Sequence, residues 1–181
     1  LRSNQRALAA IERGDFAEQI VPLNAYSYDG KGNKKEFVFE VDEGPRPSTI
    51  EALAKLRPAF ANPKAKIEGA GTVTAGNASQ MSDGAGAALV MDRARAEELG
   101  VKPWAKLHGY RVVAFDPDYM GIGPALAIPK LFETVGEKLG IGYQDVDLWE
   151  INEAFASQAI YSIKQLDLDA EKVNPNGGAI A

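Results

Sequence analysis

Asn152 and Glu153 stand where an apolar strand is expected to end and a helix to begin, in the sequence DLWEINEAFASQA. In open α/β sheets, ligands bind beyond the carboxyl ends of the strands. An amide at such a place can position a water or polarise a carbonyl group, and a carboxylate can act as a base. Both residues also fit a plain helix start, because asparagine is a good N-cap and a carboxylate stabilises a helix N-terminus. The sequence leaves both interpretations open.

Two glycine-rich segments could bring the backbone close to a ligand. Residues 74–87, TAGNASQMSDGAGA, combine small residues with short polar side chains such as Asn77 and Ser79. Residues 174–178, NPNGG, could line a site at the end of a strand. Glycine lets the backbone approach a ligand without steric cost. A tight packed bend and an ordinary turn explain the two segments equally well.

Composition excludes several classes of function. The chain has no cysteine, so within it no thiol nucleophile, disulfide or cysteine-ligated zinc site is available, and we predict no metal site. Its single histidine, His108, has no carboxylate near it in sequence and is predicted to lie on the surface. A net charge of -5 argues against a nucleic-acid surface. No apolar run approaches the roughly 20 residues of a membrane span.

Alternating strands and helices are expected to position these segments. In the first half, the pattern predicts a helix over residues 1–13 ended by Gly14, and a hairpin within residues 18–44 with a half-buried second strand. A capping box of Ser48 and Glu51 is expected to open the next helix. The second half is expected to contain strands at 87–91, 104–115, 146–151 and 173–176, and helices at 92–99, from Pro124 onward, and at 154–166. This order implies α/β layering.

Read in order, these segments resemble the thiolase family. Residues 71–91, GTVTAGNASQMSDGAGAALVM, are similar to its GTVTAGNAS-x-x-x-DGA block, and DPDYMGIGP is similar to its DP-x-x-MG-x-GP turn. DLWEINEAFASQA carries the NEAF box, VNPNGGAIA resembles the start of the VN-x-NGGAIALGHP box, and STIEALAKLRPAF resembles the loop-domain helix over coenzyme A. The resemblance covers essentially the whole chain. Pro175 departs from it, because the family usually has a small apolar residue there.

The resemblance implies an α/β, thiolase-like layered α-β-α fold, incomplete at both ends. Residues 1–78 would form the loop domain covering coenzyme A, residues 79–103 the end of the N-terminal core domain, and residues 104–181 the first part of the C-terminal core domain. The family's nucleophilic cysteine would precede Leu1, and its general-base histidine and second cysteine would follow Ala181. The 181 residues alone are therefore expected to be inactive.

The resemblance also implies an activity: thiolytic cleavage of 3-oxoacyl-CoA by CoA to acetyl-CoA and a shortened acyl-CoA, or the reverse Claisen condensation. Coenzyme A would be a substrate, with no covalently bound cofactor. The partners would be acyl-CoA and CoA, in a homodimer or homotetramer. We expect a role in fatty-acid β-oxidation and a cytoplasmic location.

Site residues follow by matching positions to the family's boxes. Asn152 would hold the water of an oxyanion hole, and Glu153 would support the NEAF box without touching substrate. The remaining implied residues would contact CoA or the acyl group: Arg46, Ala59 and Phe60 near the ADP end, Ala75 and Ser79 along the pantetheine arm, and Ala154 and Phe155 beside the reacting thioester.

Two other readings compete with the enzyme. A non-catalytic thiolase-like protein, acting as a CoA-binding or scaffold subunit, would share these boxes and lack the reactive cysteines. A generic nucleotide-binding α/β domain would need a phosphate loop of the GxGxxG or GKS/T kind, and the chain contains neither.

Overall fold

The computed structural model spans residues 1–181 and describes all of them except residues 61–70. The α-helices of at least five residues are α1 (Arg2–Arg13), α2 (Ile50–Ala54), α3 (Arg93–Glu98), α4 (Gly123–Leu131) and α6 (Ala156–Gln165). Shorter or non-α turns are η1 (Pro117–Ile122), η2 (Phe132–Gly136), α5 (Glu137–Leu139) and η3 (Tyr143–Asp145). Strands β1 (Leu23–Tyr28) and β2 (Lys34–Phe39) complete the set. Residues 62–71, NPKAKIEGAG, are expected from their sequence to be a polar connection, and they lie largely outside the described residues.

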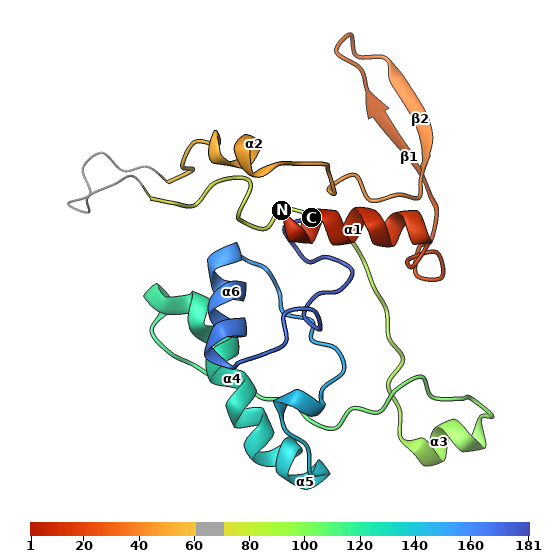
Figure 1. Ribbon diagram of the computed structural model, residues 1–181. Helices are drawn as coiled ribbons and strands as arrows, with labels where there is room; N and C mark the ends of the chain where they lie inside the picture. The colour runs from red at the N-terminus through yellow and green to blue at the C-terminus, as the bar shows by residue number, and fades with distance from the viewer. Residues whose placement is uncertain (61–70) are drawn as a thin grey trace.

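Helix α1 lies at the centre of the molecule, and both chain termini lie beside it (Figure 1). Its buried side chains are the small ones, Ser3, Ala7 and Ala10, which recur at helical spacing along one face. Gly14 ends the helix in the left-handed conformation with φ 75°, as the sequence predicts, because glycine adopts this conformation without strain. The small face lets other segments approach α1 closely.

The predicted hairpin is confirmed, but it is not half-buried. Strands β1 and β2 pair antiparallel from Leu23–Phe39 to Tyr28–Lys34 and project away from the rest of the described chain (Figure 1). The turn is held by the Asp29 carboxylate, which accepts hydrogen bonds from the side chain and backbone of Asn33 and from the backbone N–H of Lys31. The bond from the Asn33 side chain contributes most to lowering the pKa of Asp29.

The start of α2 differs from the predicted capping box. Thr49 is the N-cap, and its hydroxyl accepts a hydrogen bond from the Ala52 N–H at 3.2 Å, so Ser48 does not fill this role. Thr49 has the same capping chemistry and stands one residue closer to the helix. The leucines of this region pack on Gly76, where a Cβ atom would lie 2.7 Å from Leu53 and 2.5 Å from Leu56. Helix α2 therefore lies directly over the glycine-rich segment.

The main apolar core lies in the second half of the chain. Ile151, Leu166, Leu168 and Val173 are buried together, and Trp149 packs against them. Trp149 and Val173 form a parallel bridge, and helix α6 runs between these two segments in sequence. Two short extended segments joined by a helix are a small version of the strand–helix–strand unit of α/β proteins.

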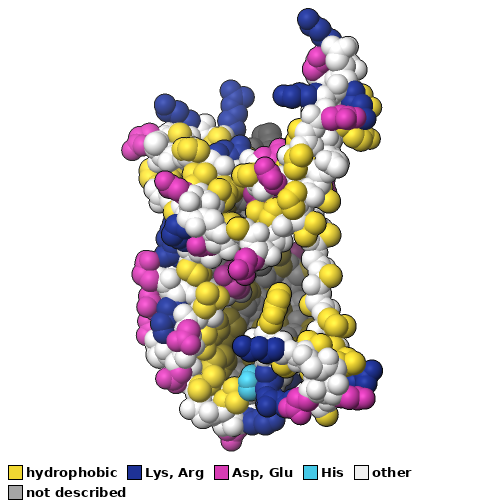
Figure 2. Space-filling model, turned by 90° about the vertical axis from the view of Figure 1, so that its right-hand side faces the viewer, with side chains coloured by type: hydrophobic (Ala, Val, Ile, Leu, Met, Phe, Trp, Pro, Cys, Tyr) yellow, Lys and Arg dark blue, Asp and Glu magenta, His cyan; other side chains and the backbone are white. Residues whose placement is uncertain are grey.

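The strands predicted at 87–91 and 104–115 do not form in the described chain. Both segments lack regular secondary structure and strand partners, and Leu89 and Val112 are 82% and 79% exposed. The predicted strands at 146–151 and 173–176 pair as strands only at the Trp149–Val173 bridge. A strand needs a neighbour for its backbone hydrogen bonds, and outside residues 61–70 the chain supplies none to the first two segments. Figure 2 shows the resulting surface, with hydrophobic side chains exposed around a hollow.

Two general features complete the description of the fold. Among the described residues, every helix is too short or too polar to cross a membrane. Outside residues 61–70, no group of three or more His, Cys, Asp and Glu side chains is arranged to hold a metal ion.

Candidate functional site

The segments GNAS and NEAF, more than 70 residues apart in sequence, lie against each other. The Ser79 N–H donates to the Ala154 carbonyl at 2.9 Å, and the Ala156 N–H donates to the Asn77 carbonyl at 2.8 Å. Between these bonds, Ala78 and Phe155 form an antiparallel bridge. The glycine-rich segment therefore fixes the backbone that immediately follows Asn152 and Glu153.

The segment GGAIA joins the same place from the end of the chain. The Ile180 N–H donates to the Glu153 carboxylate at 3.3 Å, and the Gln80 N–H donates to the Ala179 carbonyl at 3.3 Å. At Gly178 a Cβ atom would lie 2.6 Å from the Glu153 carboxyl carbon, so this close approach requires glycine. Glu153 thus connects the NEAF segment to GGAIA.

Asn152 lies exposed at this junction, between buried Ile151 and half-buried Glu153. It does not cap α6, because that helix begins at Ala156 with Phe155 as the N-cap residue. The interpretation of Asn152 as a plain helix cap is therefore wrong. The side-chain amide of Asn152 is exposed and can bind a ligand or water where GNAS, NEAF and GGAIA converge.

The glycine-rich loop before Ser79 holds its own shape. The Asn77 side chain accepts a hydrogen bond from the Thr74 N–H at 2.8 Å and donates to the Thr72 carbonyl at 3.0 Å. These two bonds close residues 72–77 into a turn, with Ala75 exposed at its tip. A small exposed residue at the tip leaves room for a ligand to pass along the backbone.

Residues predicted near the ADP end are only partly brought together. Ala59 lies beside the glycine-rich segment, since its N–H donates to the Val73 carbonyl at 2.7 Å. Phe60 follows it and is 74% exposed. Arg46 is held at the start of α1 instead, where its backbone N–H donates to the Asn4 side chain at 2.8 Å. Ser79 therefore lies beside residues 152–155. Ala59 and Ala75 lie on two segments that the hydrogen bond from Ala59 to Val73 joins, whereas Arg46 contacts α1.

Asn174 belongs to the segment 174–178 that could line a site by its sequence, but it is not among the residues matched to the thiolase boxes. It is 4% exposed, and its side-chain amide pairs with the backbone of Ile151 in both directions, each hydrogen bond 2.8 Å long. Its backbone is left-handed, with φ 48°, a conformation that asparagine tolerates better than most residues. The asparagines of VNPNGG were the available signal, but sequence alone could not give the partner, which lies 23 residues away.

Burial and a like charge act on Glu150 beside this site. Partial burial raises the pKa of the Glu150 carboxyl above its ordinary value, and the nearby Glu153 carboxylate raises it further. A folded-state pKa above the unfolded value means that folding favours the protonated acid. The contribution of Glu150 to stability is therefore present below its unfolded pKa and lost as the pH rises through its folded pKa.

We expect Glu150→Gln to raise the thermal midpoint at pH 7 in a full-length protein that carries this chain, because glutamine removes the repelled charge. The gain should shrink as the pH falls through the raised folded-state pKa of Glu150 and vanish below its unfolded pKa. Thermal unfolding at pH 7 and pH 4 measures it, with exposed Glu36→Gln on the hairpin as the control. A gain that is equal at both pH values would contradict the charge explanation.

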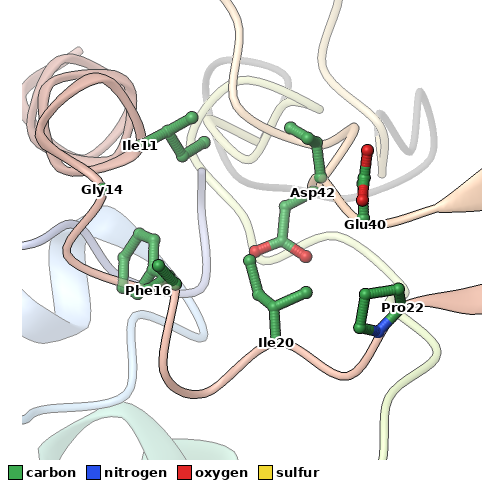
Figure 3. Close-up of a pocket in the computed structure, with 9 residues that line it drawn as sticks. Ile11, Gly14, Phe16, Ile20, Pro22, Glu40 and Asp42 are labelled. Atoms are coloured by element: carbon green, nitrogen blue, oxygen red, sulfur yellow. The ribbon is translucent and has the colours of Figure 1, made fainter.

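A separate hollow of about 330 Å³ lies where α1 leads into the hairpin. Ile11 and Phe16 lie on one side of it, Pro22, Glu40 and Asp42 lie toward the other, and Ile20 lies between them (Figure 3). None of the residues predicted to bind CoA lines this hollow. Its carboxylates also make it a poor place for a phosphate-bearing ligand, so we do not assign CoA to it.

Comparison with known families decides the relationship. The family model described as thiolase, N-terminal domain matches residues 1–94, and the model described as thiolase, C-terminal domain matches residues 101–181. The chain belongs to the thiolase family. Among curated relatives, the peroxisomal 3-ketoacyl-CoA thiolase A of Mus musculus is 50% identical over 182 residues, which cover 100% of this chain and 40% of that protein. This thiolase chain thus spans about 40% of the length of such relatives.

Solved structures agree with this assignment. Human mitochondrial 3-ketoacyl-CoA thiolase matches with a TM-score of 0.84 and 40% identity, over 99% of this chain and 42% of that one. The dimeric peroxisomal thiolase of Saccharomyces cerevisiae matches with a TM-score of 0.78 and 41% identity, also over 99% and 42%. These likenesses confirm the predicted thiolase-like α/β fold.

The predicted cytoplasmic location is wrong by the same comparison. The mouse relative, 50% identical to this chain over 182 residues, is named peroxisomal, and so is the yeast structure. Peroxisomal proteins are directed by short receptor-read segments, which composition and net charge do not reveal.

Proposed function

We propose that this chain is part of a thiolase that cleaves 3-oxoacyl-CoA with CoA to give acetyl-CoA and a shortened acyl-CoA, or that runs the reverse condensation. The observation that carries the proposal is the hydrogen-bonded convergence of GNAS, NEAF and GGAIA around Asn152. The names of the relatives support the same activity. Because the chain spans about 40% of those relatives, the proposal concerns a protein of their full length.

In this proposal the chain supplies electrostatic stabilisation, and a cysteine thiolate from the remaining length attacks the 3-oxo carbonyl. Negative charge then develops on a carbonyl or thioester oxygen, and fixed donors aimed at that oxygen lower the barrier. The exposed amide of Asn152 would hold the water that donates to this oxygen. Glu153 would keep the NEAF and GGAIA backbones together through its bond to the Ile180 N–H.

Coenzyme A would lie across the surface formed by α2 and the glycine-rich segment. Ala75 and Ser79 would meet its pantetheine arm, and Ala59 and Phe60 its ADP end, with Arg46 contributing from the α1 side. Ala154 and Phe155 would form the wall beside the thioester. In this reading residues 1–78 are the loop domain, residues 79–103 close the N-terminal core, and residues 104–181 begin the C-terminal core. The dimeric yeast structure supports a homodimer or a higher homo-oligomer.

Removing CoA contacts should mainly change the KM for CoA. In the full-length enzyme, Ser79→Ala and Phe60→Ala are each expected to raise this KM about 2–10-fold, which corresponds to a contact worth about 0.5–1.5 kcal/mol. The kcat should stay nearly constant, because these residues would bind a part of CoA that does not change during the reaction. Ser27→Ala and Phe37→Ala, at exposed positions on the projecting hairpin, serve as controls. An unchanged KM in both test variants would remove the two residues from the site.

Expression of the full reading frame tests the activity itself. The assay follows CoA-dependent loss of 3-oxoacyl-CoA and identifies acetyl-CoA and the shortened acyl-CoA by mass spectrometry. Formation of both products supports the thiolase proposal. A folded protein that binds CoA and forms neither product would favour the non-catalytic CoA-binding or scaffold subunit.

A further inference from the structure

Helix α1 is hydrogen-bonded to the turn at residues 170–178, and further hydrogen bonds connect this turn to the proposed active site. Ser3 binds Gly178 in both directions, accepting from its N–H at 2.9 Å and donating to its carbonyl at 3.2 Å. Ala7 lies against Gly177, where a Cβ atom would be 2.8 Å from the alanine methyl. Because α1 falls in the N-terminal family model and the turn in the C-terminal one, the contact joins the two matched regions.

Arg6 is the centre of this contact. Its guanidinium donates to the Val173 carbonyl at 2.6 Å, with longer bonds to the carbonyls of Ala170 and Asn174 at 3.3 and 3.4 Å. The same group pairs with the Glu171 carboxylate at 2.6 Å, and the arginine side chain is only 15% exposed. A planar fork of several N–H donors suits a cluster of carbonyls converging from one turn. Arg6 therefore fixes the backbone on both sides of Val173.

Asn174 connects this turn to Ile151 through hydrogen bonds. Its own N–H donates to the Trp149 carbonyl at 2.8 Å, and its side-chain amide then pairs with both the N–H and the carbonyl of Ile151. The side chain thus acts as an extra peptide group that continues the Trp149–Val173 bridge by one step. That step ends directly before Asn152. Asn174 has a left-handed backbone, with φ 48°, and its carbonyl accepts a hydrogen bond from the Arg6 guanidinium.

We infer that Arg6 and Asn174 are positioning residues for Asn152, which hold the end of its strand in place from helix α1. The inference rests on the proposed function, because it requires that the Asn152 amide takes part in the reaction. Neither residue is placed against substrate. Their effect on the reaction would pass entirely through the backbone at Ile151 and the orientation of Asn152.

A double-mutant cycle in the full-length enzyme tests this. Arg6→Met is expected to lower kcat about 10-fold, since small misplacements of a catalytic group cost that much or more, with the KM for CoA within about twofold of wild type. In an Asn152→Ala background the same change should alter kcat less than about twofold, because the group being positioned is gone. Asn174→Asp, which places a carboxylate oxygen against the Ile151 carbonyl, should follow the same pattern.

Two further variants make the test specific. Arg2→Met, at an exposed position of the same helix, should leave kcat unchanged. Arg6→Lys keeps the charge but loses the fork, so it should retain an intermediate kcat; it replaces Arg6→Met in the cycle if that variant does not fold. Equal losses of kcat in both backgrounds, or no loss in either, would overturn the inference while wild-type activity stands. A wild-type enzyme without thiolase activity would overturn the proposed function and this inference with it.

Discussion

Asn152→Ala in a full-length thiolase that carries this chain is expected to lower kcat about 10²–10³-fold, with a much smaller change in KM. The reason is that Asn152 stands exposed where GNAS, NEAF and GGAIA converge, and that α6 takes its N-cap from Phe155 instead. A donor that stabilises charge only in the transition state contributes to kcat and little to substrate binding. Steady-state thiolysis with varied 3-oxoacyl-CoA and CoA measures both constants.

The controls for this variant separate chemistry from folding. Asn24→Ala, on the projecting strand β1, removes the same amide from a place remote from the site and should leave kcat unchanged. The Asn152→Ala protein should melt within a few degrees of wild type, because the side chain is exposed. An unchanged kcat would show that Asn152 is an ordinary surface residue and that the oxyanion must be stabilised by other groups.

Elements with strong local signals were predictable from the sequence. The end of α1 at Gly14, the position of Pro124 in the first turn of α4 and the tight turn of the β1–β2 hairpin all depend on neighbouring residues. Gly100, with φ 66° just after α3, belongs to the same class. Each signal reflects a backbone requirement that a single residue type satisfies, so no distant partner is needed to recognise it.

Strands and long-range contacts were not predictable in the same way. Residues 104–115 have a strand-like composition, yet a strand forms only where another segment pairs with it. The hydrogen bond from Arg6 to the Val173 carbonyl joins residues 167 positions apart, and nothing near Arg6 in sequence indicates that partner. The convergence of GNAS with NEAF was expected only through family resemblance. The roles of Asn174 and Arg6 needed the structure.

The isolated 181-residue chain is expected to show no cooperative unfolding transition. Its main buried core consists of Ile151, Leu166, Leu168 and Val173, whereas large apolar side chains elsewhere remain open to water. Leu89 and Val90 are 82% and 80% exposed, and Trp104 and Leu107 are 103% and 76% exposed. Covering apolar surface stabilises by roughly 25 cal/mol per Å², so a few hundred Å² left uncovered removes several kcal/mol. A loss of that size is comparable to the whole net stability of a domain, about 5–15 kcal/mol.

Segments 81–91 and 104–115, which have no regular secondary structure, add a second problem for the isolated chain. Unpaired backbone with apolar side chains is a template for pairing between molecules, so aggregation should compete with folding. We expect the isolated chain to be insoluble or to bind a hydrophobic dye without dispersed amide resonances. Leu89→Lys with Leu107→Lys should improve its solubility and still give no sharp melt, because charge blocks association without supplying the missing contacts. A sharp cooperative melt with a dispersed amide spectrum from the unmodified chain would contradict this expectation and show that the described contacts suffice for an independent fold.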